Sequence, residues 1–126
     1  MLIEVTALSR PKANICLNSI IWAFAEYCSP AFSVEPVNIV YGEKNTVVTP
    51  YVKPKEFELQ HPHIETLIGA PIAPEAVVAN LARTGLTATP GDNGKYKVEV
   101  PFWRGDVLHE CDILEDVAIC YGYTKI

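Results

Sequence analysis

The 126-residue sequence has no long apolar run and no close cysteine pair. No apolar stretch approaches the roughly 18 residues that a membrane-spanning helix needs, so we expect no integral membrane protein. The start, Met1 to Val5, has no basic segment followed by an apolar one, so we expect no secretory signal peptide and a cytoplasmic location. None of the four cysteines forms a C-x-x-C pair, and no histidine stands at zinc-ligand spacing from two of them.

What the sequence does contain is enough apolar material for a core. Apolar residues make up 49% and charged residues 20%, which excludes a disordered tail and predicts one domain or two small ones. Cys16, Cys28 and Cys120 lie in apolar helical patterns, which predicts buried, reduced thiols. A disulfide framework would suit a secreted protein, and the sequence has no other sign of secretion.

Basic residues are scarce in the C-terminal half. No Lys or Arg lies between Arg104 and Lys125, a stretch that holds the acids Asp106, Glu110, Asp112, Glu115 and Asp116. Such a surface repels phosphate backbones, so sequence-independent nucleic-acid binding by this half is disfavoured. The alternative interpretation of this cluster of acidic residues is that it attracts a cation.

The first half predicts an α/β arrangement, and the prolines from Pro50 to Pro54 mark the best boundary in the chain. Periodicity and turn residues predict a strand at 2–5, a helix over 12–28, and a hairpin with strands at 33–41 and 46–49 around a turn at 42–45.

The second half predicts helix, helix, hairpin, helix. A strand start and a short helix are expected within 57–69, and a second helix begins at Pro74 and ends at Gly85, with Leu86 packing back over its end. A turn at 90–94 precedes a strand that alternates cleanly, and the last helix is expected to begin at an Asp112 N-cap and end at Gly122.

The acids near the last helix allow two interpretations. Asp112, Glu115 and Asp116 stand at i, i+3 and i+4, so they share one face of a first helical turn, and Asp106 arrives from the loop before it. Several carboxylates brought together favour a hard cation such as Mg²⁺. Acids in a first turn are also favoured by the helix dipole and by capping, here with Glu115 three residues after Asp112.

One ordered set of motifs resembles a known family. The run Val100-Pro101-Phe102-Trp103-Arg104-Gly105-Asp106, then 112–118, then Tyr121-Gly122-Tyr123, resembles the end of the "B-five" domain of the phenylalanyl-tRNA synthetase β subunit. Residues 63–69 and 72–85 resemble the opening of the same domain. The resemblance implies an α+β protein with a small winged-helix-like domain at 56–126. Residues 1–55 resemble the C-terminal part of the preceding editing domain in the archaeal and eukaryotic version.

The same resemblance implies a ligand set and partners. The family's Mg²⁺ carboxylates fall on Asp106, Asp112, Glu115 and Asp116, the last being a position where many relatives have Glu. Glu4 resembles an acidic residue of the editing pocket, although a solvated strand-end acid explains it equally. The implied parent is a heterotetramer of two α and two β subunits that attaches phenylalanine to its tRNA with ATP and Mg²⁺. This chain offers no nucleophile paired with a base and no phosphate-binding glycine loop, so we expect no catalytic residue in it.

Several other residues have plain structural interpretations. Trp103 is expected in the core, Arg104 beside the acidic helix, and the histidines His61, His63 and His109 at the surface without a special role. Two other functions stay open, namely a winged-helix-like nucleic-acid-binding module and a stand-alone protein-interaction module.

Overall fold

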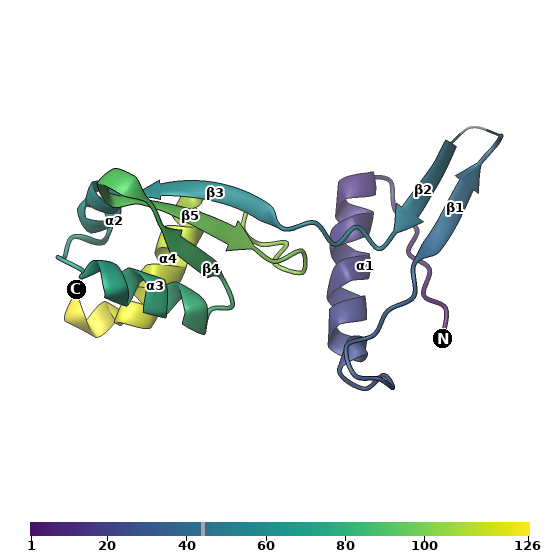
Figure 1. Ribbon diagram of the computed structural model, residues 1–126, viewed down its shortest axis with the longest axis horizontal. Coiled ribbons are helices and arrows are strands. Elements are labelled where there is room, and N and C mark those ends of the chain that lie inside the picture. The colour runs from purple at the N-terminus through teal and green to yellow at the C-terminus, as the bar shows by residue number, and fades with distance from the viewer. Residues whose placement is uncertain (44) are drawn as a thin grey trace. The chain divides into compact units, whose positions relative to one another are not determined.

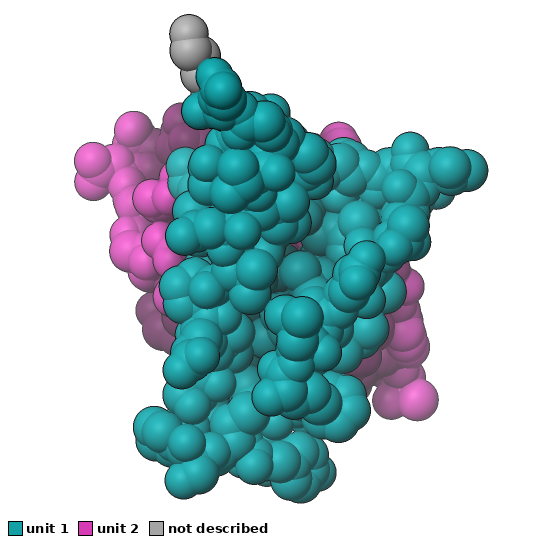
Figure 2. All heavy atoms as spheres, turned by 90° about the vertical axis from the view of Figure 1, so that its right-hand side faces the viewer, with its two compact units in different colours: residues 1–53, 102–105 teal, residues 54–101, 106–126 magenta. Residues whose placement is uncertain are grey.

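The computed structural model describes residues 1–43 and 45–126 and divides them into two compact units, coloured separately in Figure 2. Unit 1 comprises residues 1–53 and 102–105, and unit 2 comprises residues 54–101 and 106–126. Lys44, which belongs to the predicted turn at 42–45, lies outside the described residues. The two units have different organisation, and each is described by itself.

Unit 2 is a mixed α+β unit (Figure 1), as predicted. After the strand β3 the order is helix, helix, hairpin, helix, which confirms the predicted sequence of elements. In chain order the elements are β3 Lys55–Gln60, α2 His61–Ile68, α3 Pro74–Arg83, β4 Thr87–Pro90, β5 Lys95–Val100 and α4 Glu110–Tyr121, with 3₁₀ turns at Asp92–Gly94 and Tyr123–Lys125.

The three strands of unit 2 form an antiparallel sheet in the order β3-β5-β4. Along β5 every second residue is buried, which confirms the predicted alternation of Tyr96, Val98 and Val100 with charged residues. The charged face pairs across strands, with Lys95 Nζ 2.8 Å from Glu58 Oε1 and Lys97 Nζ 3.0 Å from Glu56 Oε1. One face of the sheet is therefore exposed to water, and the other packs against the core.

The core of the protein lies within unit 2. Its buried apolar side chains come from α2, α3, α4, β3 and β5 and from the segments between the elements, and Ala88 of β4 is partly buried against them. They are Leu59, Ile64, Ile68, Ile72, Val77, Leu81, Leu86, Tyr96, Val98, Val100, Val107, Ile113, Leu114, Val117 and Ala118.

Two glycines end the first two helices of this unit. Gly69 after α2 and Gly85 after α3 have φ values of 77° and 80°, a conformation that costs a residue with a side chain much more. The Leu86 N–H donates to the Leu81 carbonyl at 3.0 Å and the Leu86 side chain is buried, which confirms the predicted cap.

Unit 1 has little interior. It contains α1 Arg10–Ala25, a hairpin of β1 Val37–Tyr41 and β2 Asn45–Thr49, and the segment 102–105. Among its described residues only Asn18 and Ala25 are buried, and most of the large exposed apolar side chains of the chain lie here. The strand expected at 2–5 does not form, and α1 ends at Ala25 rather than at residue 28.

The cysteine prediction was half right. All four thiols are free, but Cys16, Cys28 and Cys111 are exposed and Cys120 is only partly buried. Along α1 the buried position is Asn18, two residues and therefore about 200° away from Cys16, so the helix turns this thiol outward. Within residues 1–43 and 45–126 no helix has the length and apolarity to cross a membrane.

Candidate functional site

The acidic stretch is organised first of all as a helix start. The N-cap of α4 is His109, whose Nδ1 accepts from the Cys111 N–H at 3.3 Å. Asp112 is the third helical residue, and its Oδ2 accepts from the N–H groups of Leu108 at 2.7 Å and His109 at 2.8 Å. A capping box is therefore present, but it pairs His109 with Asp112 rather than Asp112 with Glu115 as predicted, so the helix begins three residues earlier than expected. His109, predicted to have no special role, caps the helix.

This geometry fixes the charge of Asp112. The hydrogen bond from the His109 backbone, followed by the one from Leu108, lowers the pKa of the Asp112 carboxyl below its ordinary value of 3.8. Donors aimed at a carboxylate favour its ionised form. Asp112 is thus an anion throughout the neutral range.

The lowered pKa predicts how stability depends on pH. Because the folded state has the lower pKa, Asp112 stabilises it above pH 3.8, and this stabilisation is lost as the pH falls through the folded value. We expect the free energy of unfolding of Asp112→Asn to fall less steeply than that of the unmodified chain as the pH is lowered from neutral into the acid range. Urea denaturation at a series of pH values measures this dependence. Glu115→Gln, one turn further along, serves as the control. An unchanged slope in Asp112→Asn would show that the two backbone donors do not act on the carboxylate.

The other three predicted ligands lie in different environments. Asp106 and Glu115 are exposed, whereas Asp116 is buried, with a relative exposure of 9%. Over the described parts of the chain, no group of three or more His, Cys, Asp or Glu side chains is placed to hold a metal ion. The donor set suits Mg²⁺ because carboxylate oxygens are its preferred ligands and it needs few of them.

Glu4 is exposed and lies within the first seven residues, which form neither helix nor strand. The alternative interpretation of Glu4 as a solvated acid at a strand end is right about its exposure and wrong about the strand, which does not form. The assignment of Glu4 to an editing pocket stays a prediction.

His61, expected at the surface without a special role, instead forms a polar network with Tyr96 inside unit 2, a contact that the sequence analysis did not predict. His61 Nδ1 lies 2.7 Å from the hydroxyl of Tyr96, which is 2% exposed, and His61 Nε2 lies 3.6 Å from Glu65 Oε1. Burial, and after it the negative charges of Glu75 and Glu65, raises the pKa of Tyr96 above 10.0. Tyr96 is therefore a protonated hydrogen-bonding group and no nucleophile. The sequence did hold a signal for this contact. Tyr96 stands among the buried residues of β5, and a buried tyrosine hydroxyl needs a hydrogen-bond partner.

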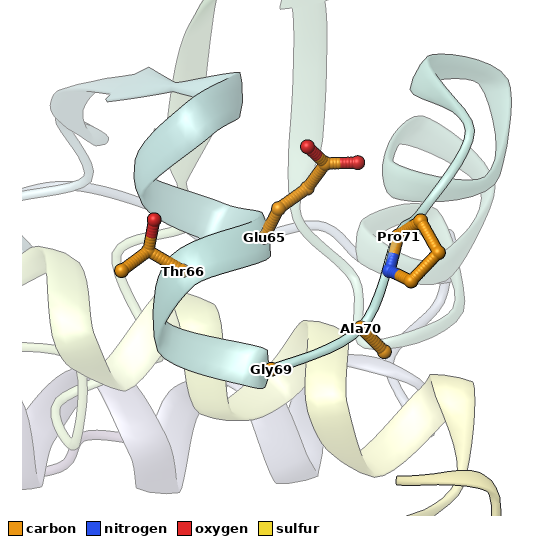
Figure 3. A pocket seen from close by; sticks show the side chains of 5 residues that line it. All are labelled: Glu65, Thr66, Gly69, Ala70 and Pro71. Atoms are coloured by element: carbon orange, nitrogen blue, oxygen red, sulfur yellow. The ribbon is translucent and has the colours of Figure 1, made fainter.

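A shallow depression lies beside this network at the end of α2. It is lined by Glu65, Thr66, Gly69, Ala70 and Pro71, and Figure 3 shows the Glu65 side chain projecting from the helix. Its polar groups have partners within the chain: Thr66 Oγ1 donates to the Pro62 carbonyl at 2.7 Å, and Glu65 Oε1 accepts from the Ile72 N–H at 3.2 Å. The depression offers no pair of groups suited to catalysis.

The fold and the acidic helix start define a small α+β unit with helices packed on one face of a three-stranded antiparallel sheet. The family model described as "tRNA synthetase B5 domain" matches residues 57–123. The chain belongs to this family.

Relatives extend the similarity over both units. The chain is 40% identical over 126 residues to a phenylalanine–tRNA ligase β subunit of Dictyostelium discoideum and 37% identical over 128 residues to a cytoplasmic one of Arabidopsis thaliana, each alignment covering 98% of this chain. It spans 20% and 21% of the lengths of these curated relatives. A solved N-terminal fragment of the phenylalanyl-tRNA synthetase β subunit from Pyrococcus horikoshii matches with a TM-score of 0.80 and 31% identity, over 91% of this chain and 32% of that one.

Proposed function

We propose that this chain is part of the β subunit of a cytoplasmic phenylalanine–tRNA ligase, whose α₂β₂ complex attaches phenylalanine to its tRNA using ATP and Mg²⁺. The observation that carries the proposal is the alignment with named β subunits over 98% of the chain, which spans unit 1 as well as the family-matched unit 2. A B5 domain used in an unrelated protein would not bring unit 1 with it.

The exposed apolar surface of unit 1 supports the assignment of residues 1–55 to a larger editing domain. Its strand β1 has no buried residue, and its apolar residues Val37, Ile39 and Val40 are all exposed. Apolar surface of this extent is unusual on a complete soluble domain and typical of a surface that other parts of a protein cover.

In the proposed function this chain contributes a scaffold, a subunit contact and a Mg²⁺ site, and it contributes no catalytic residue. Asp106, Asp112, Glu115 and Asp116 are the proposed ligands, and they hold the ion by oxygen coordination when it is bound. The nucleic-acid-binding alternative gains no support from the hairpin, because the charged face of β3 and β5 pairs Lys95 and Lys97 with glutamates and leaves no excess of positive charge.

The subunit contact is tested by reversing charge. We expect the double substitution Asp112→Lys with Glu115→Lys, made in the parent β subunit, to weaken co-purification of the α subunit at least tenfold. The reason is that like charge at a docking surface opposes association. Glu115→Lys alone, at an exposed position, separates lost contact from lost helix capping.

The matched control reverses two exposed acids on the sheet, Glu56→Lys with Glu58→Lys, and should retain the α subunit. Equal retention of α by both double variants would contradict a role for the acidic helix start in subunit contact. Circular dichroism of each variant checks that the helices remain folded.

A further inference from the structure

The outward face of α4 is unusually apolar for the water-facing side of a surface helix. Its exposed positions are Cys111, Glu115 and Ile119, which stand at i, i+4 and i+8 and therefore follow one line along the helix. We call these three residues the α4 stripe. The water-facing side of such a helix normally carries polar and charged side chains. Here the Ile119 side chain is 52% exposed, and Cys111 behaves as a small apolar residue.

The apolar surface continues past both ends of the helix. Leu108, which directly precedes the N-cap, is 73% exposed, and Tyr123, in the 3₁₀ turn after the helix, is exposed as well. The other large apolar residues of unit 2 that are exposed are Leu67 on α2 and Ile126, three residues after Tyr123. The exposed apolar area of this unit therefore gathers along α4.

Unit 1 also exposes large apolar side chains, but its aromatic rings pack on one another. Trp103, expected in the core, is only partly buried and stacks on Trp22 of α1, with 3.7 Å between ring centroids and an interplanar angle of 6°. Phe32 and Phe102 also pack against Trp22, at centroid distances of 5.5 Å and 6.2 Å. The exposed apolar area of α4 is different, because it follows one face of a single helix.

The other sides of α4 are occupied within unit 2. Arg83 Nη1 of α3 donates to the Cys120 carbonyl at 3.0 Å, and His63 Nδ1 of α2 lies 3.5 Å from Glu110 Oε1. The buried side of the helix belongs to the core. The α4 stripe is the side that these contacts leave open.

The charge around the stripe has one sign. Glu115 lies at its centre, Asp112 stands beside it in the same turns, and the exposed Asp106 precedes the helix. No Lys or Arg lies between Arg104 and Lys125. The complementary surface therefore has apolar side chains at its centre and Lys or Arg at its rim, which is how protein interfaces combine burial with charge.

The same charge disfavours two other occupants. A two-fold contact between copies of this chain uses the same surface twice. Glu115 lies midway between Cys111 and Ile119, so antiparallel packing of two stripes would bring the two Glu115 carboxylates together, and like charges oppose association. A nucleic acid is repelled because its phosphates carry the same sign of charge.

We propose that the α4 stripe, extended by Leu108 and Tyr123, is the apolar centre of a protein-docking surface whose partner presents apolar side chains surrounded by Lys and Arg. Ile119 is the central apolar contact, and Glu115 sets the preference for a basic partner. The identification of this partner with the α subunit rests on the proposed function.

The first experiment truncates the apolar contact in the parent β subunit, co-expressed with the α subunit. We expect Ile119→Ser to weaken co-purification of α at least tenfold, because truncating a central apolar side chain removes much of the binding energy of an interface. Leu67→Ser is the matched control, at 54% exposure on α2, and should retain α. Ile119→Val should retain it too, and circular dichroism checks the fold. Full retention by Ile119→Ser, or an equal loss in Leu67→Ser, would overturn the proposal.

The second experiment tests the charge of the partner through salt. We expect Glu115→Gln to weaken co-purification of α at low salt, and the difference from the unmodified subunit to disappear near 1 M salt, where the screening length is about 3 Å. The loss in Ile119→Ser should persist at both salt concentrations, since apolar contacts are not screened. Unchanged or stronger retention of α by Glu115→Gln at low salt would overturn the basic partner.

The native thiol of Cys111 measures directly whether the stripe is covered. Alkylation by iodoacetamide, followed by peptide mass spectrometry, should be at least tenfold slower at Cys111 in the complex with α than in the β subunit alone. Cys28, an exposed thiol of unit 1, is the reference whose rate should not depend on α. In Ile119→Ser the protection of Cys111 should be lost.

The two proposals fail separately. If the unmodified β subunit retains no α subunit, the subunit contact of the proposed function fails, and Cys111 still decides about the stripe. Protection of Cys111 in β alone would overturn α as the partner. Self-association of β that Ile119→Ser abolishes would do the same. Rapid alkylation of Cys111 in every preparation would overturn the docking surface itself.

Discussion

Val98→Asp is expected to unfold unit 2. Val98 is fully buried on β5, the central strand of the sheet, and its neighbours in the core are apolar. A carboxylate there has no partner, and an unpaired buried charge costs about 3–5 kcal/mol or more. Because a domain of this size is stable by only about 5–15 kcal/mol, we expect loss of most of its stability in urea denaturation followed by circular dichroism.

The control places the same carboxylate on the other face of the sheet. Thr89 is exposed on β4 and stands opposite Lys97, so Thr89→Asp puts the new charge in water beside a cation. We expect the free energy of unfolding to change by about 0.5 kcal/mol or less. Similar losses in the two variants would contradict the assignment of the core to one face of the sheet.

Leu81→Ala is expected to destabilise unit 2 by about 2–5 kcal/mol, the usual range for deleting a buried leucine side chain. Leu81 is fully buried on α3, which packs against α4, so the cavity would open between the two helices rather than at the surface. The free energy of unfolding from urea titration measures the loss.

Leu67→Ala is the matched variant on α2, where the leucine is 54% exposed. Little apolar area is lost there, and we expect a change of about 0.5 kcal/mol. If Leu67→Ala cost as much as Leu81→Ala in the isolated chain, the exposed face of α2 would have to be buried in a contact between copies of the chain.

Most of the fold of unit 2 could be predicted because its local signals agree with one another. Alternation along β5, Pro74 at the first position of α3 and glycine after α3 each specify one structure through backbone geometry and burial. The start of α4 was misplaced by three residues. Asp and Ser are the residues that usually indicate an N-cap, and a histidine in that place has no comparable sequence signal.

The ligand set for Mg²⁺ came from spacing and resemblance, and spacing specifies only which residues share a turn. Asp112, Glu115 and Asp116 do occupy the same turns of α4, yet Asp112 is engaged by two backbone donors and Asp116 is buried while Glu115 is exposed. Helical periodicity does not determine which of these carboxylates the core covers, because that depends on the elements packed against the helix.

The sequence by itself determined the class of fold, the order of elements in unit 2, the face of β5 that is buried and the resemblance to a synthetase β subunit. These depend on neighbours within a few residues or on ordered motifs. Only the tertiary structure decided that Phe102–Gly105 belongs to unit 1, that Trp103 stacks on Trp22, and that Tyr96 bonds His61. Each of these contacts joins residues at least 35 positions apart, and no local periodicity encodes a contact at that distance along the chain.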